Sequence, residues 1–578
     1  MDEVTLETGA RAPSLEEDPA LGLPIREKLE ILFAVMLGLF LGALDQTIVG
    51  PALPTVVTQL NGNDLYNWVV ISYLLTSTIS VPFWGKLSDI YGRKPLFIIG
   101  IVFFLIGSAL SGLSQDMNQL ILFRGLQGIG AGALFPIALA IIGDLFSPAE
   151  RGKYQGLFGA VFGIAFITGP LVGGWLTEHV SWHWIFYVNI PIGIISLFFI
   201  FRLLPTVKNP RATRNFDVLG GVIFTLATGA LLIGLTYKAL TDPTTHQQYD
   251  WTAWQVGGLI VAGLVGYVAF IWAERRAKEP IVPLNLFRNR TYAASMVSTF
   301  FAAFAFFGAI IFLPRWFQIV QGFSPTNSGL AALPLVGGLI GSSITSGLVV
   351  ARTGRYKWLL VGAIAIMAVA MALMTQLRSD TPIPVVWLWM FIAGLGVGPT
   401  FAVFTLVVQN AVPFNMLGVA TSNLTFFRQI GGTVALAIVG TVFGTAFQQH
   451  IVPSMTAAGV PAQLVAGFQQ GVASGQVDLS QLTGTGDLGK TILANAGPLA
   501  PVIQPYIGNL VAGIHDAFSL AVASTFWIGV GAAIVAALAA ATMQELTLRQ
   551  QTPAQAAAAA RAEGRTSDGS RPAVPAAD

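Results

Sequence analysis

Long uninterrupted runs of apolar residues dominate this chain, and its polar residues gather in the stretches between them. A helix needs about 20 largely apolar residues to cross a bilayer, and fourteen runs reach that length. The pattern predicts an all-α membrane protein with fourteen transmembrane helices. The predicted spans lie near 31–53, 66–84, 95–114, 119–143, 154–177, 184–203, 217–238, 254–273, 292–320, 326–350, 357–377, 385–408, 420–446 and 517–541.

Composition supports this prediction and excludes several classes of function. The chain is 54% hydrophobic and only 10% charged, whereas soluble proteins are about 25% charged. A net charge of +2 with dispersed basic residues argues against nucleic-acid binding. There is no cysteine, and the five histidines lie outside the apolar runs or at their edges, so we expect no metal site and no cofactor. No cluster typical of an enzyme gathers near either membrane surface.

The basic residues predict the orientation of the chain in the membrane. If the N-terminus is cytoplasmic, 24 of the 30 Lys and Arg residues fall in cytoplasmic segments. Such an asymmetry is typical of inner-membrane proteins. The first 25 residues are acidic rather than basic and do not fit a signal peptide. We therefore expect a multi-pass protein of the inner (plasma) membrane with both termini in the cytoplasm.

Two loops of the chain are related. Residues 85–94 place two glycines seven positions apart and follow the second glycine with arginine. Residues 347–357 repeat the same step and the same arginine. The chain therefore consists of two related halves, and both loops fall on the predicted cytoplasmic side.

The first loop resembles the signature between the second and third spans of major facilitator superfamily transporters. The resemblance implies that Gly85 and Gly92 allow a tight turn with close helix approach. It also implies that Asp89 and Arg93 form a charge latch that stabilises one state of the transporter. Ala351 stands at the place of the acid in the second copy, so a latch there is in doubt. An ordinary positively charged loop is the alternative for both copies.

The span count resembles one branch of that family, the fourteen-span drug:proton antiporters, over residues 30–445 and more weakly in the last span. A twelve-span member would carry the loops after spans two and eight, whereas here they follow spans two and ten. The surplus pair between the halves is the expected insertion. The predicted parts are a cytoplasmic tail (1–30), a six-helix bundle (31–203), a two-helix insert with linkers (204–280), a second six-helix bundle (281–545) and a disordered tail (546–578).

Residues 447–516 are predicted to form an outside segment, rich in Gly, Gln, Ala and Pro. The segment is too long for a turn. Short helices at the outer surface are one possibility, and disorder of its middle is another.

Asp45 is the one acidic residue well inside a predicted span. It shares a helix face with Gly38 and Gly42, which permit close packing. A carboxylate inside a membrane is costly unless it is paired or protonated, and so it is a functional candidate. The surrounding residues resemble the family's first-span motif. A purely structural acid held by local hydrogen bonds is the alternative.

Arg124 is a charged residue inside the fourth predicted span, as Asp45 is in the first. Gly128 and Gly132 follow at steps of four, so the guanidinium lies on a stripe where helices approach closely. The segment resembles the family's fourth-span motif, in which the arginine is linked to proton transfer by acting on a nearby acid. Asp45 is one candidate partner, and a structural arginine bound to carbonyl groups is the alternative.

The fifth span carries a face of almost bare backbone. Gly156, Gly159, Gly163, Pro170 and Gly174 fall within about 60° of one another around a helix. The segment containing Gly169, Pro170, Gly173 and Gly174 resembles the motif associated with antiporters. We expect this face to pack closely on another helix, and we expect Gly169, which falls on a different face, to tolerate substitution.

Three further residues are weaker candidates. Asp144, at the end of the fourth span, suits a gate or docking role. Arg315 near the outer end of the ninth span either reaches the membrane surface or faces substrate. Arg428 belongs to a segment of the thirteenth span that is similar to the family's pattern, although the loop before it, 410–418, lacks the usual basic residues.

Together these features predict a proton-coupled antiporter that exports lipophilic drugs or related amphipathic compounds by alternating access. The family resemblance implies the substrate class. With a single buried acid, a monovalent, neutral or amphipathic substrate is expected, and the chain is expected to work as a monomer. Export of an endogenous lipid or metabolite, or a membrane sensor without transport, are the alternatives.

Overall fold

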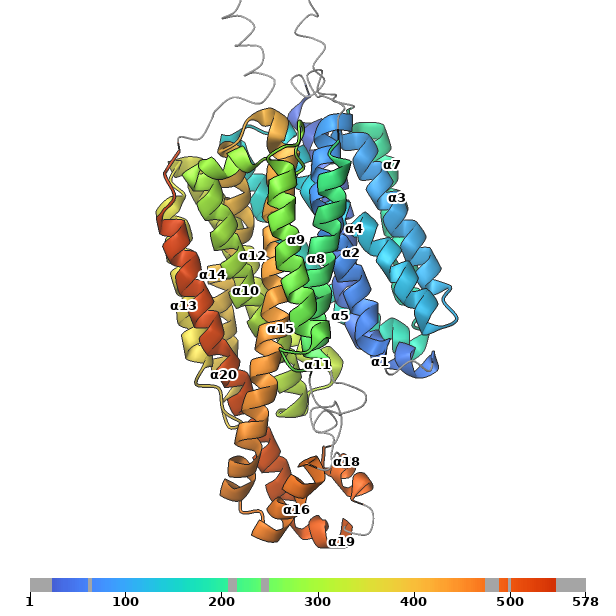
Figure 1. The fold of residues 1–578 in the computed structure, drawn as a ribbon, viewed down its shortest axis with the longest axis vertical. Helices are drawn as coiled ribbons and strands as arrows, with labels where there is room; N and C mark the ends of the chain where they lie inside the picture. Colours follow the sequence, from blue (N-terminus) through green and yellow to red (C-terminus); the bar gives the residue numbers. More distant parts are fainter. Residues whose placement is uncertain are drawn as a thin grey trace, which may run out of the picture.

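A computed structural model describes residues 23–60, 65–205, 216–240, 249–473, 488–496 and 500–546. Within these ranges, fourteen helices are long and apolar enough to cross a membrane. They run side by side along the long axis of the molecule (Figure 1). The predicted all-α membrane protein with fourteen spans is confirmed. The two tails for which the sequence predicts no span lie mostly outside the described residues.

The first half is a bundle of six spans. Helix α1 packs on α5 and α7, and α4 packs on α2 and α3. The sixth span is built from two consecutive helices, α6 and α7. The bounds are α1 (Ile25–Gln59), α2 (Tyr66–Tyr91), α3 (Arg93–Gly112), α4 (Met117–Leu145), α5 (Pro148–His179), α6 (Trp184–Tyr187) and α7 (Asn189–Leu203).

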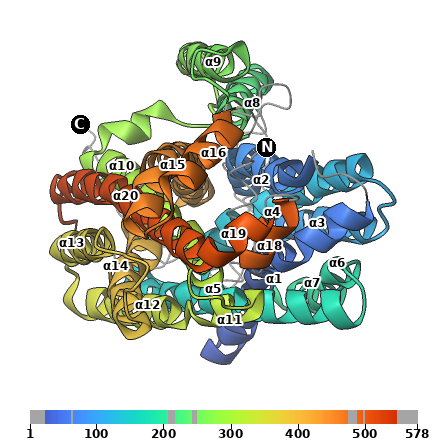
Figure 2. The same cartoon turned by 90° about the horizontal axis from the view of Figure 1, so that it is seen from below.

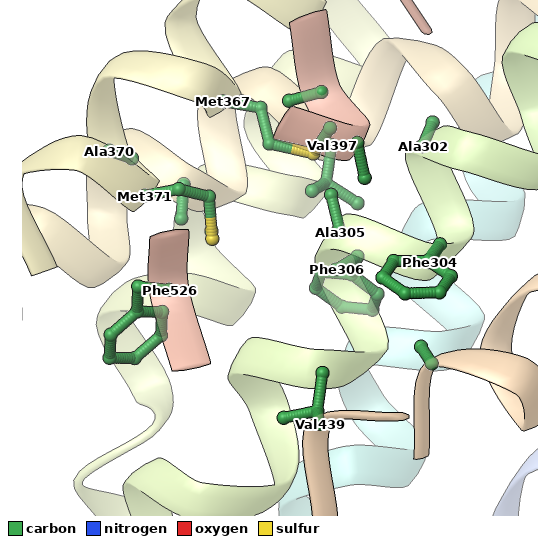
Figure 3. Close-up of a cluster of buried hydrophobic side chains, with 14 of the residues drawn as sticks. Ala302, Phe304, Ala305, Phe306, Met367, Ala370, Met371, Val397, Val439 and Phe526 are labelled. Carbon is green, nitrogen blue, oxygen red and sulfur yellow. The ribbon is translucent and has the colours of Figure 1, made fainter. Parts of the chain in front are cut away.

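The second half is a similar bundle. Helix α12 packs on α14, and α20 packs on α10, α13 and α15. Met367, Met371 and Phe526 fill its core together with Phe306 and Val397, which reach in from two further helices (Figure 3). The bounds are α10 (Arg290–Ile319), α11 (Pro325–Leu330), α12 (Leu333–Thr353), α13 (Lys357–Met374), α14 (Ile383–Asn410), α15 (Leu417–Ala457) and α20 (Ile507–Ala541).

The two halves meet along two seams, α2 against α15 and α5 against α12. The first glycine of each related loop lies in one of them. A Cβ atom on Gly85 would lie 2.7 Å from the carbonyl oxygen of Gly418, and one on Gly347 would collide with the carbonyl of Gly152. Only glycine lets the helices approach this closely. The repeat in the sequence therefore corresponds to a repeated contact between the halves.

The second glycine of each related loop turns the chain. Gly92 has φ of 97° and Gly354 has φ of 70°, in the region that side chains disfavour. Gly92 separates α2 from α3, and Gly354 follows α12. Both predicted tight turns are present.

The additional pair of helices, α8 (Val218–Ala239) and α9 (Leu259–Glu274), lies between the halves in sequence. The two helices pack on each other, and α8 also contacts α2 and α15 (Figure 2). A cavity of about 260 Å³ between α2, α8 and α15 is lined mainly by aliphatic side chains. The predicted two-helix insert thus covers the α2–α15 seam from one side.

The segment 447–516 differs from its prediction at both ends. Helix α15 continues to Ala457 and α20 begins at Ile507, so both helices extend into this segment, beyond the predicted span ends at 446 and 517. The extensions are held together, since the Ser454 hydroxyl donates to Asp516 Oδ2 at 3.0 Å. The predicted short helices are present at this end of the molecule (Figures 1 and 2), namely α16 (Ala462–Ala473), α18 (Leu488–Asn495) and α19 (Ala500–Ile503). The middle of the segment, 474–487, lies outside the described residues.

Candidate functional site

Asp45 and Arg124 form an ion pair in the interior of the first half. Arg124 Nη1 lies 2.7 Å from Asp45 Oδ2. The exposed fractions of the two residues are 2% and 0%, so neither charge is hydrated. A buried pair of this kind is stable only while both charges stay together. The structure therefore brings together the two residues that the sequence singled out on separate spans.

Two amide side chains that the sequence analysis did not assign complete this site. Gln127 Nε2 donates to Asp45 Oδ1 at 2.8 Å, and Asn189 Nδ2 donates to the same oxygen at 3.1 Å. The Arg124 guanidinium also lies 4.2 Å above the ring of Tyr73. Both residues could have been identified from the sequence. Gln127 follows Arg124 by three positions and so lies on the same helix face, and Asn189 is a single amide in an apolar span.

This arrangement suits the ionised form of Asp45. Its carboxylate accepts hydrogen bonds from three side chains on two other spans, and charged acceptors make the stronger hydrogen bonds. Binding of a proton would remove the charge that holds Arg124, and Arg124 would then need a new partner. The site can thus convert a change of protonation into a movement of α1 relative to α4.

Helix α4 is in direct backbone contact with α2. A Cβ atom on Gly128 would lie 3.0 Å from Tyr73 Cα, and one on Gly132 would lie 2.7 Å from the carbonyl oxygen of Ser77. The close approach predicted for the Arg124 stripe is therefore present. Residues 85–91 of the related loop are the last turns of α2, and Gly92 makes the turn itself, so α2 connects the Arg124 stripe to the charged residues of the loop.

The charged residues of that loop form a compact network. Arg93 Nη1 lies 2.5 Å from Asp89 Oδ1, and Arg93 Nε lies 3.0 Å from Asp144 Oδ2. Arg93 also donates to the Ser88 hydroxyl at 2.7 Å. Asp144, predicted only as a gate or docking residue, thus joins the proposed latch pair.

The same Asp89 reaches across to the other half. Its two carboxylate oxygens accept the backbone N–H groups of Gly418 at 3.0 Å and Val419 at 2.8 Å. These are free donors of the first turn of α15, where an anion is also favoured by the helix dipole. The segment 410–418 lacks the basic residues usual in the family at this place. The helix N-terminus takes their place.

The insert is tied to the same loop. Lys86 Nζ lies 2.9 Å from Glu279 Oε2, in the linker that follows α9. Nothing in the sequence indicated this contact, because the two residues are far apart along the chain. In the second copy of the loop, Arg352 is exposed and forms no salt bridge within the described residues.

The glycine face of α5 packs on α12 as predicted. A Cβ atom on Gly159 would lie 2.6 Å from Ser343 Cβ, and one on Gly163 would lie 2.7 Å from side-chain carbons of Ile340 and Val336. These contacts form the second seam between the halves. A larger side chain there would separate α5 from α12.

Gly169 does not behave as expected. A Cβ atom at this position would lie 2.6 Å from Thr47 Cβ on α1, so the prediction that it tolerates substitution is wrong. The Thr47 hydroxyl donates to the carbonyl of Ala165 at 2.9 Å, which pulls α1 against α5 beside the proline. Gly173 faces Ile48 in the same way. Helix α5 is therefore in close contact on two faces, one toward each half.

Replacing Gly163 by leucine is expected to give a folded protein with transport reduced at least about tenfold, because overpacking of this seam costs about 1–3 kcal/mol. The matched control is Gly341→Leu on the facing helix α12, where a Cβ atom meets nothing within 4 Å. Size-exclusion chromatography reports folding, and uptake into proteoliposomes reports transport. Equal transport by the two variants would remove the argument for a special seam.

The two remaining candidates lie in the second half. Arg315 is exposed near the end of α10 that lies away from the latch. Arg428 is half-buried in α15, where it donates to the carbonyl of Thr400 at 3.3 Å and its guanidinium lies 4.5 Å above the ring of Phe401. Neither residue contributes to the Asp45 site.

Two related bundles with a buried ion pair in one and a network of charged residues between them are typical of secondary transporters. A sequence profile of the Major Facilitator Superfamily matches residues 35–436, and the chain belongs to this family. It is thus a multi-pass membrane transporter and not an enzyme.

Relatives with known names agree with this assignment. The chain is 39% identical to the Multidrug transporter protein MdtP of Bacillus subtilis (strain 168), over 75% of this chain and 79% of the relative. It is 37% identical to Multidrug resistance protein 3 of the same organism, over 73% and 80%. The solved structure of the proton:xylose symporter XylE is similar in fold, with a TM-score of 0.55 at 14% identity, covering 93% of this chain and 100% of that one.

Proposed function

We propose that this protein is a proton-coupled antiporter that exports lipophilic or amphipathic compounds, including drugs. The observation that carries the proposal is the buried pair of Asp45 and Arg124 inside a major facilitator fold. The names of the two Bacillus subtilis relatives support the substrate class. In the proposed cycle, Asp45 takes up a proton from the outside and releases it to the cytoplasm.

In the proposed cycle, the latch couples the protonation of Asp45 to the opening of the cytoplasmic side. Contacts of Asp89 with Arg93 and with the N-terminus of α15 hold the cytoplasmic ends of the halves together. Protonation of Asp45 frees Arg124, the shift passes through α4 to α2, and the latch opens to admit substrate. Loss of the proton restores the ion pair and closes the latch.

In this proposal, the protein works in the inner (plasma) membrane, and it works as a monomer because one chain contains both halves. It needs no cofactor. A direct test uses purified protein in liposomes with an imposed pH gradient and a fluorescent lipophilic compound inside or outside. Accumulation that follows the sign and size of the gradient supports antiport. Movement that is independent of the gradient would contradict it.

The proposed orientation puts both termini and the loop 85–94 in the cytoplasm and the helices α16, α18 and α19 outside. Gln470 is exposed in α16, and the chain has no cysteine of its own. We expect Gln470→Cys to react with a membrane-impermeant maleimide in intact cells. Labelling only after the cells are opened would reverse the topology.

A further inference from the structure

Among the residues that the structure describes, Arg428 is a charged residue inside the second half without an acidic partner. Between residues 281 and 477 the sequence contains a single acid, Asp380, and it lies exposed in the loop between α13 and α14. Asp516 on α20 is engaged with Ser454 at the outer end. In the described chain Arg428 forms no salt bridge.

The position of Arg428 makes this lack of a counter-charge costly. It lies 11 residues after the first residue of α15, about 16 Å along the helix, and a hydrocarbon core is about 30 Å thick. A charge at this depth is expensive unless it has a partner or meets a water-filled cavity.

The guanidinium keeps donors available for such a partner. Of its five N–H groups, one is engaged within the described chain, in the 3.3 Å hydrogen bond to the Thr400 carbonyl. None of its nitrogen atoms is both buried and without a partner, so the remaining donors reach open space. They are therefore free to bind a group that the protein itself does not supply.

An aromatic surface lies beside this charge. The Arg428 guanidinium lies over one face of the Phe401 ring. The centroid of the Phe401 ring lies 5.5 Å from that of Phe162 in the first half. Phe162 in turn stacks on Phe135 at 5.1 Å, and Phe401 lies 6.5 Å from Phe306. The aromatic series thus crosses the boundary between the halves, where an alternating-access transporter binds its cargo.

We propose that Arg428 binds an anionic group of the cargo while the apolar body of the cargo packs against Phe401 and Phe162. The assignment rests on the proposed transport function and narrows its substrates to amphipathic organic acids such as carboxylates and sulfonates. A guanidinium binds such groups through paired, charge-assisted hydrogen bonds. A lipophilic cation in the same place would meet an unscreened like charge.

The test compares two probes that share a pyrene ring on a short alkyl chain and carry opposite charges, 1-pyrenebutyrate and 1-pyrenebutyltrimethylammonium. Their binding to the purified full-length protein is followed by pyrene fluorescence, without a pH gradient. The wild type is expected to bind the acid about tenfold or more tightly than the ammonium probe. Arg428→Gln is expected to remove that preference by weakening binding of the acid about tenfold or more, with binding of the ammonium probe unchanged or tighter.

Two further variants separate the charge from the shape of the site. Arg428→Lys keeps the charge and should retain part of the preference, whereas Arg352→Gln, at an exposed position in the second copy of the loop, should retain all of it. Equal affinity of the wild type for both probes would overturn the assignment, and this result needs no variant to fold. Equal weakening of both probes by Arg428→Gln would also overturn it.

The binding test and the antiport test can fail separately, so their results distinguish the proposed binding site from the proposed function. If acid binding depends on Arg428 but no pH gradient moves either probe, the proposed function fails and the binding site stands. If a pH gradient drives transport and Arg428→Gln changes neither probe, the binding site fails and the function stands.

Discussion

Asp45→Asn is expected to abolish export driven by a proton gradient while leaving substrate binding measurable. Asparagine keeps the shape of the side chain and can still accept from Gln127 and Asn189, which lie within 3.1 Å of Oδ1. It carries no charge and takes up no proton. Substrate binding by this variant should also lose its dependence on pH when the substrate itself does not titrate.

The loss should be complete because one proton supplies the driving force. A proton moving down about 100 mV releases about 2.3 kcal/mol, enough for a roughly fiftyfold gradient of a neutral substrate. Without a titrating group at position 45, this free energy is not transferred. The measurement is the steady-state substrate gradient across proteoliposomes at a fixed pH difference.

Two controls address the buried arginine that the variant leaves behind. Removing one partner of a buried pair typically costs about 3–5 kcal/mol, so Asp45→Asn alone can lower stability. The double variant Asp45→Asn/Arg124→Gln removes both charges and should be as inactive but more stable. Asp45→Glu should keep part of the activity with an altered pH profile. If Asp45→Asn still builds a substrate gradient, the proton is carried elsewhere, and Asp144 is the next candidate.

Asp89→Asn is expected to lower the rate of turnover about tenfold or more while changing substrate affinity little. The Asp89 carboxylate holds Arg93 at 2.5 Å and two amides of α15 within 3.0 Å, and it lies far from any proposed cargo contact. Loss of about 1.4 kcal/mol from this network shifts the populations of the two states tenfold. The latch therefore acts on conformational equilibrium rather than on binding.

A cysteine at position 422 reports the latch directly. Ser422 is buried against Gly85 in the α2–α15 seam, so Ser422→Cys should react slowly with maleimide while the latch is closed. Adding Asp89→Asn should raise that rate. Arg352→Gln in the second copy of the loop is the control, because Arg352 is exposed, and it should change neither labelling nor turnover. Unchanged turnover in Asp89→Asn would leave the loop with a topological role only.

The hydrophobic pattern was sufficient for the architecture. Span number and the two related halves follow from local composition and from one repeated loop, because a helix in lipid satisfies its own backbone hydrogen bonds. The place of the additional pair of helices came from the family resemblance, through comparison with twelve-span members. Asp45 and Arg124 were identifiable for the same reason, since an ionisable residue in an apolar run stands out without any knowledge of the fold.

The tertiary structure decided which residues meet. Sequence spacing places Gly169 on a different face of α5 from Gly163, but only the packing shows that this second face presses on Thr47 of α1. Likewise, Asp89 binds backbone amides that begin α15, and backbone donors leave no mark in the residue pattern. Periodicity describes one helix at a time, whereas the rotation and offset of each helix against its neighbours depend on side chains that are distant along the chain.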